Sequence, residues 1–209
     1  MRRFFGAAAV VAALLVVAAI LLQTPGAFAA SGGKDTPSGK GIVYLIRGGL
    51  NIFSTGMDDL AETLRERGVD ARSVSHPSWR DTAGTIVERY RAKPAPVVIG
   101  GHSFGANAAI LVAEYLGQNN IPVALVILFD PTERFKAPAN VKRIVNFLSL
   151  DSTGLDFNVF ANASYSGQVE NIVLRDLNHL TIDNDEALHE RTVEEIAKVV
   201  GASRRASTR

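Results

Sequence analysis

Short apolar runs recur along the chain between residues 42 and 176, separated by segments with a mixed polar pattern. Several runs are continuous rather than alternating, which is typical of strands that are covered on both faces, as in a parallel sheet. The predicted strands are residues 42–47, 69–75, 96–101, 123–130, 143–151 and 171–176.

Amphipathic segments between these runs predict helices. Residues 56–67 have apolar side chains at the i, i+3, i+4 and i+7 positions of a helix. Thr55 and Asp58 predict a capping box at its start, and Gly68 predicts its end. Further helices are predicted over residues 82–92, 104–116 and 185–200.

The alternation of strands and helices predicts an α/β fold, in which a parallel sheet lies between two helical layers. Two connections, residues 130–141 and 151–170, lack an evident long helix. The alternating region, residues 41–200, is long enough for a single domain with one good core.

The N-terminal segment has the pattern of a secretory signal peptide. Two arginines precede an uninterrupted apolar stretch, residues 4–22, and a small-residue Ala27-Phe28-Ala29 site follows it. We predict cleavage after Ala29; the alternative is an uncleaved anchor, because 19 apolar residues can span a bilayer. Either way the domain is expected outside the cytoplasmic membrane, either periplasmic or secreted. Residues 30–40 read as a polar linker, and residues 201–209 as a disordered basic tail.

Composition excludes several classes of function. The 22 basic and 21 acidic residues leave a formal net charge of +1, which does not favour nucleic-acid binding. The chain has no cysteine, so disulfide scaffolds, zinc-thiolate sites and cysteine nucleophiles are excluded. Phosphate-loop, dinucleotide and metalloprotease motifs are also missing, and no cofactor or metal is implied.

The most informative motif is Gly101-His102-Ser103-Phe104-Gly105, which joins a predicted strand directly to a predicted helix. This is the context in which G-x-S-x-G forms a nucleophile elbow, a tight turn that presents a serine at the edge of a sheet. Side chains at either glycine would collide across such a turn. Ser103 is therefore the candidate nucleophile.

On this motif and its context, the chain resembles the α/β-hydrolase superfamily, in particular its small, lidless serine esterases and thioesterase-like members. The resemblance covers roughly residues 41–200. It implies a three-layer fold with a minimal sheet of about six strands, in the order second, first, third, fourth, fifth, sixth. It also implies that an acid and then a histidine follow the nucleophile along the chain.

Of the four histidines, His179 has the position that the resemblance implies for the general base. It follows the last predicted strand and precedes the last helix. His76 precedes the serine, His102 adjoins it inside the elbow, and His189 lies within the last helix.

The orienting carboxylate has several candidates at the ends of strands. We favour Asp130, which follows the strand next to the nucleophile strand, as in thioesterase-like members; Pro131 is expected to hold it extended. The alternatives are Asp151, Asp156 and Asp176, and most superfamily members carry the acid one strand later than Asp130.

The oxyanion of an acyl-transfer intermediate needs two backbone N–H donors. One is expected from Phe104, and the other from Gly49 or Leu50 in the glycine-containing loop after the first strand. Related enzymes usually have His-Gly in this loop, whereas this chain has Arg47-Gly48.

These observations predict an exported serine hydrolase that cleaves carboxylic ester or thioester bonds of a small-molecule or lipid substrate through an acyl-enzyme. Membrane contact is expected only through the N-terminal segment, if it is retained. The alternatives are an acyltransferase with the same triad, or a catalytically inactive binding or secretion-accessory protein that keeps the fold.

Overall fold

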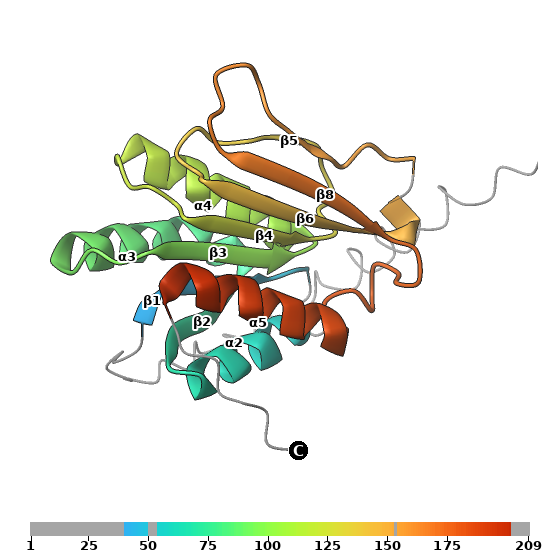
Figure 1. Ribbon diagram of the computed structural model, residues 1–209, viewed down its shortest axis with the longest axis horizontal. Helices are drawn as coiled ribbons and strands as arrows, with labels where there is room; N and C mark the ends of the chain where they lie inside the picture. Colours follow the sequence, from blue (N-terminus) through green and yellow to red (C-terminus); the bar gives the residue numbers. More distant parts are fainter. Residues whose placement is uncertain (1–39, 50–53, 153, 202–209) are drawn as a thin grey trace, which may run out of the picture. The chain divides into compact units, whose positions relative to one another are not determined.

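A six-stranded parallel sheet forms the centre of the computed structural model, which describes residues 40–49, 54–152 and 154–201 (Figure 1). The strand order is β2-β1-β3-β4-β6-β8, and each neighbouring pair is parallel. The strands are β1 (Lys40–Arg47), β2 (Val69–Ser75), β3 (Val97–His102), β4 (Leu125–Phe129), β6 (Arg143–Ser149) and β8 (Gln168–Leu174). Both the fold class and the predicted strand order are confirmed.

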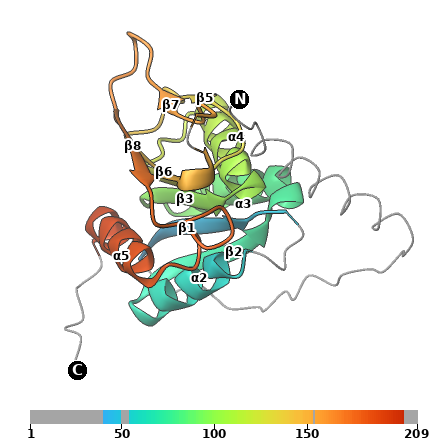
Figure 2. The ribbon, with the colours of Figure 1, turned by 90° about the vertical axis from the view of Figure 1, so that its right-hand side faces the viewer.

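Two helices cover each face of the sheet (Figures 1 and 2). One core lies under α3 (Trp79–Ala92) and α4 (Phe104–Gln118), and the other under α2 (Gly56–Glu66) and α5 (Glu186–Val200). Successive residues of a strand enter opposite cores, as the period of two requires: in β1, Ile42 and Tyr44 contribute to the first, and Val43 and Leu45 to the second.

In their described residues, the two connections predicted to lack a long helix contain none. Instead, β5 (Phe135–Lys136) and β7 (Val159–Phe160) pair in parallel as a small second sheet. The described residues also contain two short 3-10 helices, η2 (His76–Ser78) and η3 (Leu150–Ser152). The second sheet joins the segment that follows β4 to the segment that follows β6.

The predicted capping box at α2 is wrong. Thr55 has helical dihedrals, φ −67° and ψ −23°, whereas a side-chain cap requires extended backbone. Its carbonyl accepts hydrogen bonds from the N–H groups of Asp58 and Asp59, and its side chain makes no cap bond. At the other end, Gly68 has φ +77°, as expected of a glycine that ends a helix.

The ends of the predicted domain need small corrections. Lys40, which we assigned to the linker, is the first residue of β1, and Gly201, assigned to the tail, caps α5 with φ +68°. The predicted signal segment 1–29, the rest of the linker and residues 202–209 lie outside the described residues. Within the described ranges, no helix is both long and apolar enough to cross a bilayer.

Candidate active site

The nucleophile elbow forms at the junction of β3 and α4. Ser103 has φ +56° and ψ −124°, a conformation that is strained for a residue with a side chain and is typical of functional sites. Its N–H donates to the carbonyl of Phe129 at 2.9 Å, and its carbonyl accepts from Ala106 and Asn107 in the first turn of α4. These bonds hold the turn against β4 and the helix.

The two elbow glycines are required by close backbone approach. A Cβ at Gly101 would collide with the carbonyl of Gly105, and a Cβ at Gly105 would collide with the carbonyl of Ile46. Both obstacles are backbone atoms, which cannot move aside as a flexible side chain could. The steric reason predicted for the motif is therefore present in the structure.

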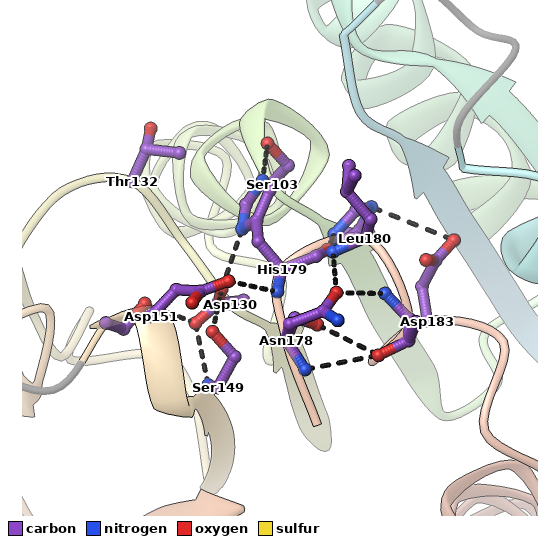
Figure 3. Close-up of polar contacts among 12 residues, drawn as sticks. Ser103, Asp130, Thr132, Ser149, Asp151, Asn178, His179, Leu180 and Asp183 are labelled. Atoms are coloured by element: carbon purple, nitrogen blue, oxygen red, sulfur yellow. Dashed lines mark hydrogen bonds and ion pairs between the residues drawn. The ribbon is translucent and has the colours of Figure 1, made fainter. Parts of the chain in front are cut away.

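Ser103, His179 and Asp130 lie in one hydrogen-bonded chain (Figure 3). Ser103 Oγ is 3.0 Å from His179 Nε2, and His179 Nδ1 is 2.6 Å from Asp130 Oδ2. Ser103 is 7% exposed, Asp130 is fully buried, and the His179 side chain is 31% exposed. The partly exposed imidazole thus bridges a fully buried carboxylate and a serine that is itself largely buried.

The Asp130 carboxylate has several donors besides the imidazole. Its Oδ1 accepts from the Ser149 N–H at 2.9 Å and from the Ser152 hydroxyl at 2.5 Å, while Oδ2 accepts from the Ser149 hydroxyl at 2.6 Å. Burial opposes ionisation of Asp130, but the hydrogen bonds from His179, Ser149 and Ser152 outweigh it and lower its pKa. Asp130 is therefore held as a carboxylate.

The backbone of Asp130 differs from our expectation. We predicted an extended residue before Pro131, but its φ is +51°. Aspartate tolerates positive φ better than most residues, and its side chain is fixed by the serine donors at the end of β6. Its direction is set by these tertiary contacts rather than by the strand.

The alternative acids have other contacts. Asp151 Oδ2 accepts the backbone N–H of His179 at 3.0 Å, so it contacts the peptide and not the imidazole. Asp156 forms an ion pair with Arg134 at 3.1 Å on the surface. Asp176 borders a shallow depression of about 450 Å³ beyond the end of β8. None of the three has a recorded bond to the imidazole among the described residues.

The predicted oxyanion donors come from adjacent segments. Phe104 is the first residue of α4, where N–H groups have no intrahelical partner and the helix dipole is positive. A Cβ built on Gly49 would lie 3.1 Å from the Phe104 ring, so the loop after β1 runs directly beside the elbow. Leu50, the alternative donor, lies outside the described residues.

Arg47, which replaces the usual histidine, takes part in an ion pair outside the triad. Its guanidinium donates to both carboxylate oxygens of Asp58 at 3.3 Å, in the first turn of α2. His76 instead supports this loop, because its Nδ1 donates to the carbonyl of Gly48 at 3.1 Å. His76 was excluded as the base because it precedes Ser103 in the chain. No signal in the sequence predicted its contact with this loop.

Asn107 supports the loop that follows Asp130, and sequence reasoning missed it. Its amide donates to Thr132 Oγ1 at 2.8 Å and accepts the Thr132 N–H at 3.1 Å. The sequence signal that could have marked it is an asparagine in the otherwise apolar first turn of the helix that follows the elbow; in the structure its side chain is 8% exposed.

The fold and the elbow together define an α/β-hydrolase. Residues 58–206 match the family described as Serine hydrolase, which covers well over half of the chain. The chain therefore belongs to the serine hydrolase family and is a hydrolase enzyme; the prediction of an enzyme rather than an inactive binding protein agrees with this membership. No curated protein matches the chain by sequence.

Solved structures share the fold at low sequence identity. One comes from work on LipS and LipT, two metagenome-derived lipolytic enzymes, with 14% identity, a TM-score of 0.56, and coverage of 77% of this chain and 96% of that chain. An arylesterase has 10% identity and a TM-score of 0.55, covering 79% of this chain and 77% of that chain. TT1662 from Thermus thermophilus has 12% identity and a TM-score of 0.53, covering 80% of this chain and 92% of that chain.

Proposed function

We propose that this serine hydrolase cleaves carboxylic ester or thioester bonds through an acyl-enzyme, with Ser103 as nucleophile, His179 as general base and Asp130 as the orienting acid. The observation that carries the proposal is the continuous chain of hydrogen bonds from Ser103 Oγ through His179 to Asp130, at 3.0 and 2.6 Å. Both distances lie within the reach that proton transfer requires.

In the acylation step, Ser103 Oγ forms a bond to the acyl carbon while its proton moves to His179 Nε2. The carbonyl electrons move to the oxygen, and the N–H groups of Phe104 and Gly49 are the proposed donors to that oxyanion. When the carbonyl re-forms, the bond to the leaving alcohol or thiol breaks, and the proton on Nε2 goes to the leaving group.

Deacylation repeats the sequence with water. His179 takes a proton from a water molecule, whose oxygen attacks the acyl carbon, and the bond to Ser103 Oγ breaks as the proton returns to the serine. Asp130 stays ionised throughout and stabilises the imidazolium that forms in each half-reaction. Its lowered pKa supports this role, because a protonated carboxyl could not do so.

A fluorophosphonate probe tests the nucleophile directly, because it forms a covalent bond with an activated serine. We expect the wild-type protein to be labelled and to hydrolyse p-nitrophenyl acetate, and Ser103→Ala to lose both properties. Ser164→Ala is a suitable control, since Ser164 is exposed and bonds only to Asn162 among the described residues. Undiminished labelling of Ser103→Ala would overturn the assignment.

We further propose that the domain is exported and acts on lipid or other extracytoplasmic esters. The N-terminal arginines, the apolar stretch and the Ala27-Phe28-Ala29 site support export. N-terminal sequencing of the protein from its natural compartment should give Ala30, and Ala29→Leu should block cleavage. A full-length protein confined to the cytoplasm would contradict the proposal.

A further inference from the structure

His102, which adjoins the nucleophile in the chain, has a buried side chain that the mechanism above does not use. It is 2% exposed, and its ring centroid lies 5.0 Å from the ring centroid of His179. A buried imidazole needs partners for both ring nitrogens, and those partners identify what it does.

The two nitrogens of His102 have different partners. Nε2 lies 2.9 Å from the backbone carbonyl of His179, and Nδ1 lies 2.8 Å from the hydroxyl of Ser54. A carbonyl oxygen can only accept, so Nε2 carries the hydrogen. In the neutral ring, Nδ1 is then the acceptor, and Ser54 is the donor.

The ring stays neutral under ordinary conditions. Burial, and then the nearby charge of His179, lower the pKa of His102 to about 4, against weaker opposing effects of the His179 carbonyl and Asp130. Asp183 Oδ2 lies 3.7 Å from His102 Nδ1, beyond hydrogen-bonding distance. A single tautomer, with hydrogen on Nε2, is thus consistent with every contact of the ring.

Two side chains bind the backbone of His179, and His102 is one of them. The His179 N–H donates to Asp151 Oδ2 at 3.0 Å, and the His179 carbonyl accepts from His102 at 2.9 Å. Both peptide groups of the proposed base are therefore held by side chains from other elements. One of them belongs to the residue immediately before Ser103, so the loop of the base is tied to the strand that carries the nucleophile.

We propose that His102 is a positioning residue: its Nε2–H holds the His179 carbonyl, and so fixes the imidazole of the base at bonding distance from Ser103 Oγ. This inference rests on the proposed function. Loss of the contact should lower kcat and leave KM nearly unchanged, because a displaced base affects proton transfer rather than substrate binding. A displacement of about 1 Å in such a constellation costs about 100-fold.

Two polar replacements of His102 form a matched pair. The amide nitrogen of Gln reaches about as far as Nε2 and can donate to the His179 carbonyl, whereas the amide of Asn reaches only about as far as Nδ1. We expect His102→Gln to retain kcat for p-nitrophenyl acetate within about fivefold and His102→Asn to lose about 30- to 100-fold, with KM within about twofold in both. Equal rates in the two variants, with equal thermal stability, would overturn the proposal.

The wild-type protein gives a second test that needs no substitution. In protein labelled with nitrogen-15 in its histidines, long-range proton–nitrogen spectra distinguish a ring protonated at Nε2 from one protonated at Nδ1. We expect the Nε2–H tautomer for His102 at neutral pH; the Nδ1–H tautomer would overturn the proposal even if no variant folds. Absence of probe labelling and ester turnover in the wild type would instead refute the proposed function.

Discussion

The Asp151 carboxylate accepts the peptide N–H of His179 at 3.0 Å, whereas the Asp130 carboxylate lies 2.6 Å from Nδ1 of the imidazole of His179. Two carboxylates at the ends of neighbouring segments thus have different relations to one histidine. Only the carboxylate on the ring can select its tautomer and stabilise its positive charge.

Asp130→Asn is expected to lower kcat for p-nitrophenyl acetate by about 10⁴-fold, because the imidazole loses its orienting acceptor and its countercharge. Asp151→Asn should stay within about tenfold, since its amide oxygen can still accept the His179 N–H. Thermal unfolding of both variants serves as the control for folding. A loss confined to Asp151→Asn would identify that residue as the acid instead.

Ser152→Ala should destabilise the fold by about 1.5–3 kcal/mol at neutral pH, because its hydroxyl bonds the buried, ionised Asp130. The pKa of Asp130 is lowered in the folded protein, so its stabilising effect is present above the unfolded pKa and is lost as the pH falls through the folded pKa. The deficit of the variant should therefore shrink in acid. Urea unfolding at neutral and acidic pH measures it, and a deficit independent of pH would argue against this origin.

Asp183→Asn should become relatively more stable as the pH rises. Burial raises the pKa of Asp183 from 3.8 to about 6, outweighing hydrogen bonds from its own N–H and that of Gly56; His179 also lowers it, and Asp59 raises it. The folded state therefore favours the protonated form of Asp183. The stabilisation that this gives the fold is fully present below the unfolded pKa and is lost as the pH rises through about 6.

The difference in unfolding free energy between Asp183→Asn and wild type should shift by about 2 kcal/mol in favour of the variant between about pH 4.5 and about pH 7.5. Urea unfolding of the two proteins side by side measures this shift. His102 Nδ1 lies 3.7 Å away, but its pKa near 4 keeps it neutral where Asp183 ionises, so it supplies no countercharge. A constant difference would mean that Asp183 titrates normally.

Gly105→Ala should lower the unfolding free energy by about 3 kcal/mol or more, since the added methyl collides with the backbone carbonyl of Ile46. Gly84→Ala, within α3, is the matched control: a Cβ there meets no atom within 4 Å. It should be neutral or stabilising by up to about 1 kcal/mol, because alanine is the better helix former. Similar effects in calorimetry would show that the elbow relaxes easily.

The framework of this enzyme could be predicted from sequence because each element carries a local signal. The apolar runs predicted the strands of the sheet, the amphipathic segments predicted its helices, and the G-x-S-x-G motif predicted the elbow. Asp130 and His179 could be singled out because each follows a predicted strand.

The contacts that surround the candidate triad had no such signal. Ser149 and Ser152 reach Asp130 from 19 and 22 residues away, and His102 reaches the His179 carbonyl across 77 residues. Serine and histidine at these positions fit an ordinary strand end equally well, so only the tertiary arrangement distinguishes them. The positive φ of Asp130 was missed for the same reason, since local preference before proline favours extended backbone.

The separation of 76 residues between Ser103 and His179 also has a consequence for folding. Contacts distant in sequence must repay the entropy of closing the intervening chain, so they form late and together with the sheet between them. The elbow itself contacts β4 and Ile46 of β1, and the proposed base, His179, can reach it only once the sheet that extends to β8 has formed. During refolding, recovery of activity would therefore mark completion of the native topology, later than the return of helical signal.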